Sequence, residues 1–257
     1  RDTIIELCFC LSMIMIDLSR IAEDFILWSS SEFDYVELAD ELTSSSSVMP
    51  QKKNPCPLEL MRAKAAYVIG LVFSIMAMVK ALPSGYSRDL QDTKHVLFRA
   101  ITITSDSLNI MGSVIETLHV NKKTMLKSAE NSYAISLDIA EELVRNGMVF
   151  RKTHKVVGEL VRVASRTGKN LCNLTENEIR NVAGKELTPL ISKIIKNISP
   201  KHSVQSRVSV GSPNPKEQIR MIKDRKRKVN GYKLTIEKRS ERVHYSFENL
   251  ARIVKSF

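Results

Sequence analysis

The 257-residue sequence predicts an all-α protein in which a bundle of long helices is followed by a small helical domain. Residues 3–28, 58–82 and 95–118 each repeat apolar side chains at the spacing of one helix face. Helices of that length would extend about 35 Å each, which is typical of helices that pack lengthwise in a bundle. A hydrophobic share of 43% is enough to bury a substantial core.

The first long helix is predicted from Ile4, Leu7, Leu11, Ile14 and Leu18, which recur every three or four residues. The other two long segments have the same spacing and equally broad apolar stripes. So few long helices in one chain cannot cover stripes of this width. We therefore expect partner helices from other subunits to cover them.

Shorter helices are predicted in the second half of the chain. We expect one over residues 122–146, ended by Gly147, another over residues 151–166, ended by Gly168, and a third over residues 175–182. The third begins with a Thr-Glu-Asn-Glu pattern that is typical of a capping box.

The C-terminal part is first turn-rich and then basic. Residues 203–215 are predicted to form a loop, residues 216–228 a basic helix, and residues 232–237 a short strand before a last helix. The expected domains are a long-helix segment, a small helical domain and a basic extension, at residues 1–119, 120–215 and 216–257.

The formal net charge of +11 is concentrated in the basic extension. Residues 216–257 contain 13 Lys/Arg and 5 Asp/Glu, a net charge of +8, so the rest of the chain carries +3. A basic run such as residues 223–228 is usually a solvated face. Nucleic-acid binding through it is an alternative, which steep salt dependence would reveal, but no aromatic residue is interleaved before Tyr232 to stack on bases.

The start of the chain does not resemble a signal peptide, because Arg1 and Asp2 lead into a helix that carries further charges. The most apolar stretch, residues 70–79, is expected to be too short to span a bilayer. These observations favour a soluble, cytoplasmic protein.

The cysteines show no paired framework, and we expect them to be reduced and mostly buried. They are Cys8, Cys10, Cys56 and Cys172. The five histidines have no cysteine or carboxylate partners at ligand spacing, so no metal site is predicted.

The most informative segment is residues 43–54, TSSSSVMPQKKN, which is called the signature loop below. Elimination next to a carboxylate needs a base to remove a weakly acidic proton from carbon, and cations or amide donors to hold the dianion. Ser46 or Ser47 could be that base if Lys52 and Lys53 supplied a positive field in a site closed to water. Composition alone favours a solvated linker instead.

Two further polar groups have alternative interpretations. Asn54 could donate a hydrogen bond to a ligand or cap the next helix, whose first turn tolerates Pro55 and Pro57. A second set supplies a phenol, an amide and an ammonium, which suit a substrate bearing carboxylates and a guanidinium. This set is Tyr86, Gln91 and Lys94, and its alternative is a polar turn between helices.

The signature loop resembles the GSSxMPxKxN signature of the fumarase/aspartase superfamily, with Ser45 where the family has glycine. Its MPQKKNP wording is similar to the argininosuccinate lyase branch. The segments LSRIAEDFILWSS, LPSGYSRDLQDTK and LVRNGMVFRKTHKVVG also resemble that family. The resemblance extends from residue 1 to about residue 215 and implies a long-helix bundle of the fumarase/aspartase type.

The resemblance implies specific roles for residues of this chain. Ser46 matches the proton-abstracting base, and Lys52 matches the lysine that stabilises the aci-carboxylate intermediate. Substrate-binding roles are implied for Ser47, Asn54, Tyr86, Gln91 and Lys94. The implied reaction is the reversible anti elimination of argininosuccinate to arginine and fumarate in arginine biosynthesis, and it needs no cofactor.

The same family carries an N-terminal portion with a catalytic histidine, and nothing in this sequence matches that portion. Family active sites combine segments from three subunits of a homotetramer, so the chain alone is expected to be inactive. Two other functions are kept as alternatives. One is a sibling lyase such as adenylosuccinate lyase or fumarase, and the other is a non-catalytic, crystallin-like structural protein on the same scaffold.

Overall fold

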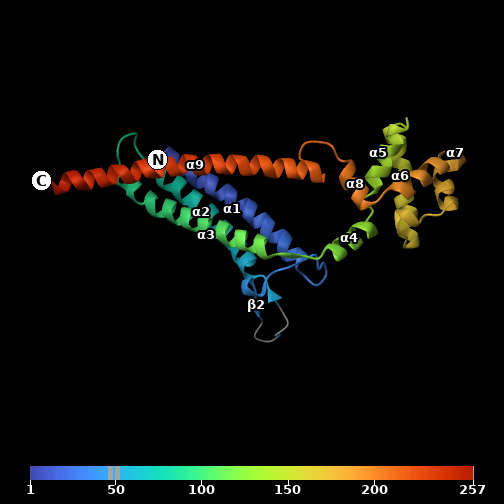
Figure 1. The fold of residues 1–257 in the computed structure, drawn as a ribbon, viewed down its shortest axis with the longest axis horizontal. Coiled ribbons are helices and arrows are strands. Elements are labelled where there is room, and N and C mark those ends of the chain that lie inside the picture. The colour runs from blue at the N-terminus through green and yellow to red at the C-terminus, as the bar shows by residue number, and fades with distance from the viewer. Residues whose placement is uncertain (46–48, 50–52, 257) are drawn as a thin grey trace. The chain divides into compact units, whose positions relative to one another are not determined.

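The computed structural model of the protein describes residues 1–45, 49 and 53–256 (Figure 1). Ser46, Ser47 and Lys52 of the signature loop lie outside the described residues. The chain forms two compact units, a bundle unit, Arg1–Lys127, and a second unit, Ser128–Phe257. Within the described residues the regular structure is nine α-helices, three short 3-10 helices and four two-residue strands. The predicted all-α class is therefore confirmed.

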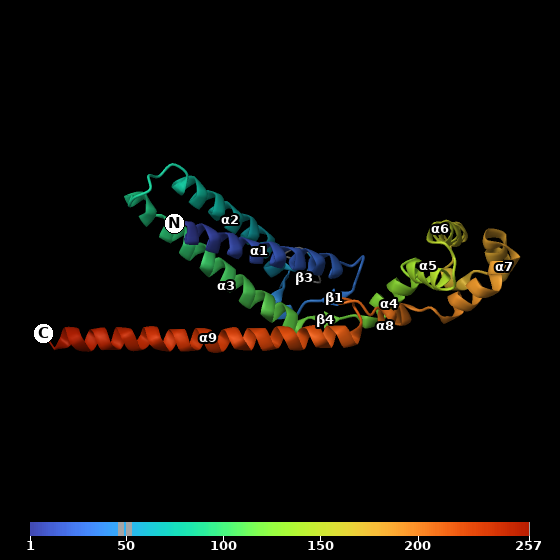
Figure 2. The ribbon, with the colours of Figure 1, turned by 90° about the horizontal axis from the view of Figure 1, so that it is seen from above.

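The bundle unit is built from three long helices that lie side by side (Figures 1 and 2). They are α1 (Asp2–Trp28), α2 (Cys56–Val79) and α3 (Thr93–Thr117), and they confirm the three predicted long segments to within three residues at each end. Pro55 lies at the N-cap position of α2 and proline is tolerated in its first turn, as expected. The fully buried core side chains include Met15, Leu58, Met61, Ile75 and Val114.

The outer faces of the long helices are also apolar. Phe9 on α1, Phe73 on α2 and Phe98 on α3 are 54%, 66% and 62% exposed. In addition, α2 is long and apolar enough to cross a bilayer, by length and composition only, among the described residues. Residues 70–79, which were expected to be too short to span a bilayer, form the end of this 24-residue helix. In the bundle, α2 packs on both α1 and α3.

Short strands connect the ends of the long helices. The strand β1 (Val36–Glu37) pairs antiparallel with β4 (His119–Val120), and the 3-10 helix η1 (Asp40–Leu42) follows β1. The signature loop begins and ends in a second antiparallel pair, β2 (Ser44–Ser45) and β3 (Lys53–Asn54). These pairs place the base of the signature loop beside the junction that leads into α2.

The predicted helix over residues 122–146 is two helices, α4 (Lys122–Asn131) and α5 (Ser136–Arg145). The break falls at Ser132, whose hydroxyl accepts a hydrogen bond from the Ala134 N–H at 3.3 Å. Serine side chains that bond to nearby backbone compete with helical hydrogen bonding. A helical apolar period can therefore continue across a break in the helix.

The helix α6 (Phe150–Thr167) ends at Gly168, which has a left-handed conformation with φ of +64°, as predicted. Next come η3 (Leu171–Asn173) and α7 (Glu176–Asn197). The predicted capping box is present, because the Thr175 side chain accepts from the Glu178 N–H and the Glu178 carboxylate accepts from the Thr175 N–H. The predicted end at residue 182 lies two residues before Gly184, where the helical backbone is interrupted.

The helix α7 continues past residue 182 through a kink at Gly184, where φ is +79° and ψ is 168°. Only glycine adopts this backbone region readily, and the chain resumes its helix beyond it. Buried side chains of α5, α6 and α7 form the core of the second unit, with Ile139, Leu143, Leu160, Ile179 and Ile191 all at most 1% exposed.

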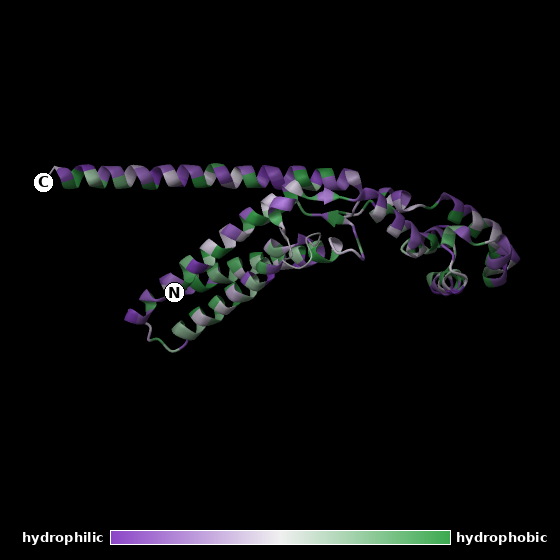
Figure 3. Ribbon diagram, turned by 90° about the horizontal axis from the view of Figure 1, so that it is seen from below, coloured by the Kyte–Doolittle hydropathy of each residue, from purple (hydrophilic) through white to green (hydrophobic). Residues whose placement is uncertain are grey.

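The basic extension is one helix, α9 (Pro215–Lys255), and it has no buried residue. The predicted strand at residues 232–237 is therefore wrong, because its alternating pattern lies inside a continuous helix and has no partner strand. The predicted loop at residues 203–215 is shortened by α8 (Pro200–Ser206). Figure 3 shows that α9 is largely hydrophilic with apolar residues interspersed.

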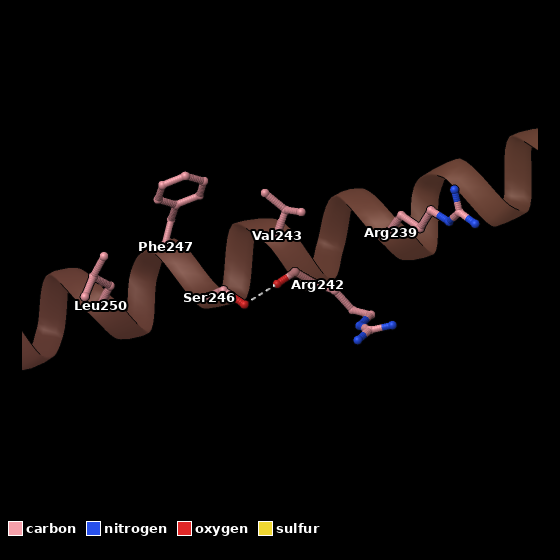
Figure 4. A pocket seen from close by; sticks show the side chains of 6 residues that line it. All are labelled: Arg239, Arg242, Val243, Ser246, Phe247 and Leu250. Carbon is pink, nitrogen blue, oxygen red and sulfur yellow. Dashed lines mark hydrogen bonds between the residues drawn. The ribbon is translucent and has the colours of Figure 1, made fainter. Parts of the chain in front are cut away.

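One face of α9 carries a shallow hollow of about 480 Å³. Figure 4 shows its lining side chains, with the Ser246 hydroxyl donating to the Arg242 carbonyl at 2.9 Å. They are Arg239, Arg242, Val243, Ser246, Phe247 and Leu250.

The expectation of mostly buried cysteines is also wrong. All four are free thiols, but only Cys8 is buried, while Cys56 is half-buried and both Cys10 and Cys172 are exposed. Burial raises the pKa of the Cys8 thiol. An apolar run in sequence therefore did not distinguish the inner face of α1 from its outer face.

Candidate active site

The β2–β3 pair holds the two ends of the signature loop together. Ser44 lies opposite Asn54, and Ser45 lies opposite Lys53. The Ser44 hydroxyl also hydrogen-bonds to the Cys56 thiol at the start of α2, at 2.7 Å. In sequence, Ser46 directly follows β2 and Lys52 directly precedes β3.

Asn54 is half-buried and ends β3 immediately before α2. The alternative that it caps α2 is not observed, because the N-cap residue is Pro55 and no side chain makes a cap hydrogen bond there. Asn54 instead lines a hollow of about 620 Å³ at the base of the signature loop. An amide in this place can donate to or accept from a ligand.

Lys53 is committed to two carboxylates within the chain. Its Nζ lies 2.6 Å from Glu37 Oε1 and 2.5 Å from Asp40 Oδ1. The hydrogen bond to Asp40, and after it the one to Glu37, raises the pKa of Lys53 well above its ordinary value. The expectation that Lys53 adds a free positive field beside Lys52 is therefore wrong, since two negative partners more than balance its charge.

The hollow beside Asn54 is lined by several acidic side chains that the sequence reasoning did not single out. Glu32 and Asp34 come from the loop after α1, and Glu59 comes from the first turn of α2. The pKa of Glu32 is lowered by a hydrogen bond from its own backbone N–H and then by the Ser30 hydroxyl. Such a lining favours cationic or hydrogen-bond-donating groups over anions. The only sequence signal was the density of acids between residues 32 and 41.

The second set of predicted site residues lies in the connection between α2 and α3. Gln91 Nε2 donates to the Tyr86 hydroxyl at 3.4 Å, and Tyr86 is 78% exposed. Gln91 ends η2 (Arg88–Gln91), and Lys94 follows in the first turn of α3 with its side chain exposed. The structure thus brings the phenol and the amide together on an open surface.

Local contacts fix this turn. The Ser87 hydroxyl donates to the Asp89 carboxylate, and this hydrogen bond lowers the pKa of Asp89. The Arg1 guanidinium donates to the carbonyls of Pro83, Ser84 and Gly85 at 2.9, 2.6 and 3.0 Å. The start of α1 therefore holds the turn in place, a contact that spans more than eighty residues of sequence and that no local pattern signalled.

The described residues of the two sets, Asn54 and the Tyr86 turn, lie at opposite ends of α2 (Figure 1). The signature loop precedes this 24-residue helix and the Tyr86 turn follows it. A rise of 1.5 Å per residue separates the two sets by about 36 Å. One chain therefore cannot place both sets around one small-molecule substrate.

Comparison with protein families identifies two segments of the chain. Residues 1–70 match the family described as lyase, and residues 133–205 match the family described as argininosuccinate lyase C-terminal. The first match covers α1 and the signature loop, and the second covers α5, α6, α7 and part of α8.

Curated relatives match both units. The chain is 44% identical over 254 residues to argininosuccinate lyase of Nitrosopumilus maritimus, covering 98% of the chain and 52% of the relative. It is 40% identical over 212 residues to argininosuccinate lyase of Schizosaccharomyces pombe, covering 82% of the chain and 45% of that relative.

Solved structures share the fold. An EDDS lyase variant with bound fumarate matches with a TM-score of 0.78 at 26% identity, over 90% of this chain and 47% of that one. A class II fumarase from Schistosoma mansoni matches with a TM-score of 0.60 at 20% identity, over 77% of this chain and 40% of that one, and indicates fold alone. The chain spans about half the length of the curated relatives it matches, and over that span it is a homologue of argininosuccinate lyases.

Proposed function

We propose that the protein cleaves argininosuccinate reversibly to arginine and fumarate. The observation that carries the proposal is the 44% identity to a curated argininosuccinate lyase across nearly the whole chain, signature loop included. A bound fumarate in an EDDS lyase of the same fold supports the product class. Arginine biosynthesis and a cytoplasmic location follow from this activity as parts of the proposal.

The proposed chemistry starts at the succinyl part of the substrate. Ser46 takes the proton from the carbon next to a carboxylate, and Lys52 stabilises the aci-carboxylate dianion that forms. Electrons then return to form the double bond of fumarate as the carbon–nitrogen bond breaks on the opposite face. A general acid protonates the guanidinium nitrogen of the departing arginine, so the substrate loses one proton to Ser46 and gains one at nitrogen, and the atoms and charges balance.

The remaining site residues bind the substrate in this proposal. Ser47 and Asn54, at the signature loop, bind the substrate through hydrogen bonds. Tyr86, Gln91 and Lys94 supply a phenol, an amide and an ammonium for the carboxylates and the guanidinium at the other end of the bundle.

We further propose that each active site is shared between copies of the chain in a homotetramer. The 36 Å length of α2 supports this, since the two sets of one chain are too far apart to meet. The exposed apolar faces of α1, α2 and α3 offer a surface for such assembly. The chain alone is then inactive. In this proposal it consists of a long-helix segment, a small helical domain and a basic extension, at residues 1–119, 120–215 and 216–257.

The test is fumarate formation from argininosuccinate, followed by ultraviolet absorbance, with the natural polypeptide that contains these 257 residues. Ser46→Ala should lower kcat by about a hundredfold or more, because a general base contributes that much. The matched control is Ser45→Gly, which places the family's glycine beside the base and should keep activity. A correctly assembled tetramer that forms no fumarate would refute the lyase and leave a structural role.

A further inference from the structure

Lys53 occupies a junction between two short antiparallel pairs. It lies in β3 opposite Ser45, the residue directly before the proposed base. Its ammonium contacts Glu37 of β1 and Asp40 of η1, at 2.6 and 2.5 Å. One side chain thus joins the ladder of the signature loop to the segment that precedes it.

That preceding segment is itself anchored to the bundle. Glu37 lies opposite His119 in the β1–β4 pair, and β4 follows the end of α3. The Asn121 N–H donates to the Tyr35 carbonyl at 2.9 Å and extends the same connection. Lys53 therefore connects the β2–β3 ladder, through Glu37 and the β1–β4 pair, to the end of α3.

The two ion pairs do not serve mainly as a source of global stability. The side chains of Lys53, Glu37 and Asp40 are 46%, 59% and 82% exposed, and exposed pairs contribute little to the free energy of folding. Their effect is local, because the carboxylates of β1 and η1 both contact the Lys53 ammonium and so favour one position of β3. A displacement of about 1 Å at a reacting group can cost about a hundredfold in rate.

We propose that Lys53 is a positioning residue, which fixes the β2–β3 ladder at the base of the signature loop through Glu37 and Asp40, rather than a cation that binds substrate. The inference rests on the proposed lyase function for its kinetic consequence. Its structural consequence, the fixed ladder, stands apart from that function.

The first experiment measures the ladder without activity. Deuterium uptake of peptides covering residues 41–56 is compared between the wild-type polypeptide, Lys53→Met and the double variant Glu37→Gln/Asp40→Asn. In both variants, the backbone amides of residues 41–56 should exchange faster than in the wild type. The amides of α3 should exchange at the wild-type rate. The matched control is Glu41→Gln, a neighbouring acid on η1 outside the Lys53 contacts, which should exchange as wild type. Unchanged uptake in Lys53→Met would overturn the proposal.

The second experiment measures fumarate formation by the same variants. Lys53→Met should lower kcat about tenfold and change KM less than about twofold, and Lys53→Arg should recover most of the rate. The Glu37→Gln/Asp40→Asn variant should reproduce the loss, and combining it with Lys53→Met should add little, since both remove one interaction. If Lys53→Met raises KM strongly while Glu37→Gln/Asp40→Asn changes neither kcat nor KM, Lys53 binds the substrate and the proposal is wrong. Absence of wild-type activity would refute the lyase but leave the exchange result decisive for the ladder.

Discussion

The ion pair between Arg207 and Asp138 should be a strong determinant of the stability of the second unit. Arg207 follows α8, and its guanidinium donates to Asp138 Oδ1 and Glu141 Oε1 on α5, both at 2.7 Å. The Asp138 side chain is only 7% exposed, and its second oxygen has no hydrogen-bond partner among the described residues. Arg207→Met would therefore leave a buried carboxylate without its cation.

The expected cost is much larger than that of a surface pair. Removing one partner of a buried pair costs about 3–5 kcal/mol, whereas exposed pairs contribute about 0–1 kcal/mol. Arg207 is 26% exposed, so water can reach the vacated position and the lower figure, about 3 kcal/mol, applies. For a unit of this size that corresponds to a fall in Tm of about 10 °C.

Two optical signals separate the units in this measurement. The single tryptophan, Trp28, lies at the end of α1 in the bundle unit, so its fluorescence reports that unit in urea titrations. Far-ultraviolet circular dichroism reports the helices of both. Arg207→Met should lower the dichroism midpoint of the second unit and leave the Trp28 midpoint unchanged.

A second substitution tests the reasoning itself. Asp138→Asn in the Arg207→Met background removes the buried charge and should recover about 2 kcal/mol. Glu141→Gln, at a carboxylate that is 36% exposed, should cost less than about 1 kcal/mol. If Asp138→Asn lowers the stability of Arg207→Met further, the buried carboxylate is not the source of the loss and the argument fails.

Three further predictions concern single groups. The pKa of Glu178 is lowered to about 2, chiefly by the Lys169 ammonium, so the native state binds fewer protons than the unfolded chain. The stabilisation from Glu178 is therefore complete above pH 4.5 and is lost as the pH falls towards 2. In Glu178→Gln, the urea midpoint should depend less on pH over that range. Gly184→Ala should destabilise the second unit by about 1–3 kcal/mol because φ is +79°, whereas Gly158→Ala, in the regular helix α6, should stabilise it by about 0.5–1 kcal/mol in the same titration. The buried Ser107 hydroxyl has no partner among the described residues, so Ser107→Ala should raise the free energy of unfolding of the bundle unit, followed by Trp28 fluorescence, by about 1 kcal/mol. The substitution Ser113→Ala, at an exposed serine of the same helix, is the neutral comparison.

The long helices were predictable because their apolar spacing persists over six or seven turns, which no strand or loop reproduces. The breaks were less predictable, since they depend on single hydrogen bonds such as that from the Ala134 N–H to the Ser132 hydroxyl. The strand predicted at residues 232–237 shows the same limit. Six residues with alternating hydrophobicity are compatible with a strand or with a helix. The helical sequence on both sides of residues 232–237 favours the helix.

The candidate site was predictable in its residues and not in its contacts. The order of residues in the signature loop carries the family resemblance, but the balance of charge at Lys53 depends on Glu37 and Asp40 lying within 2.6 Å. Likewise, the Arg1 guanidinium reaches the Tyr86 turn only because α1 and α2 run antiparallel over their full length. These contacts depend on how the helices and strands pack, and local sequence patterns do not predict that packing.

The isolation of α9 has a consequence for its mechanical behaviour. With no buried side chain among its described residues, the helix is held by its backbone hydrogen bonds and by ion pairs near its start, such as Glu217 with Arg220 and Asp224 with Lys228. Between Lys228 and Val243 no ion pair is found in the described structure, and Gly231 there costs about 1 kcal/mol relative to alanine. The helix should therefore bend first near Gly231, so that α9 behaves as two stiff rods joined by a hinge, and salt weakens the ion pairs within the rods but not the hinge.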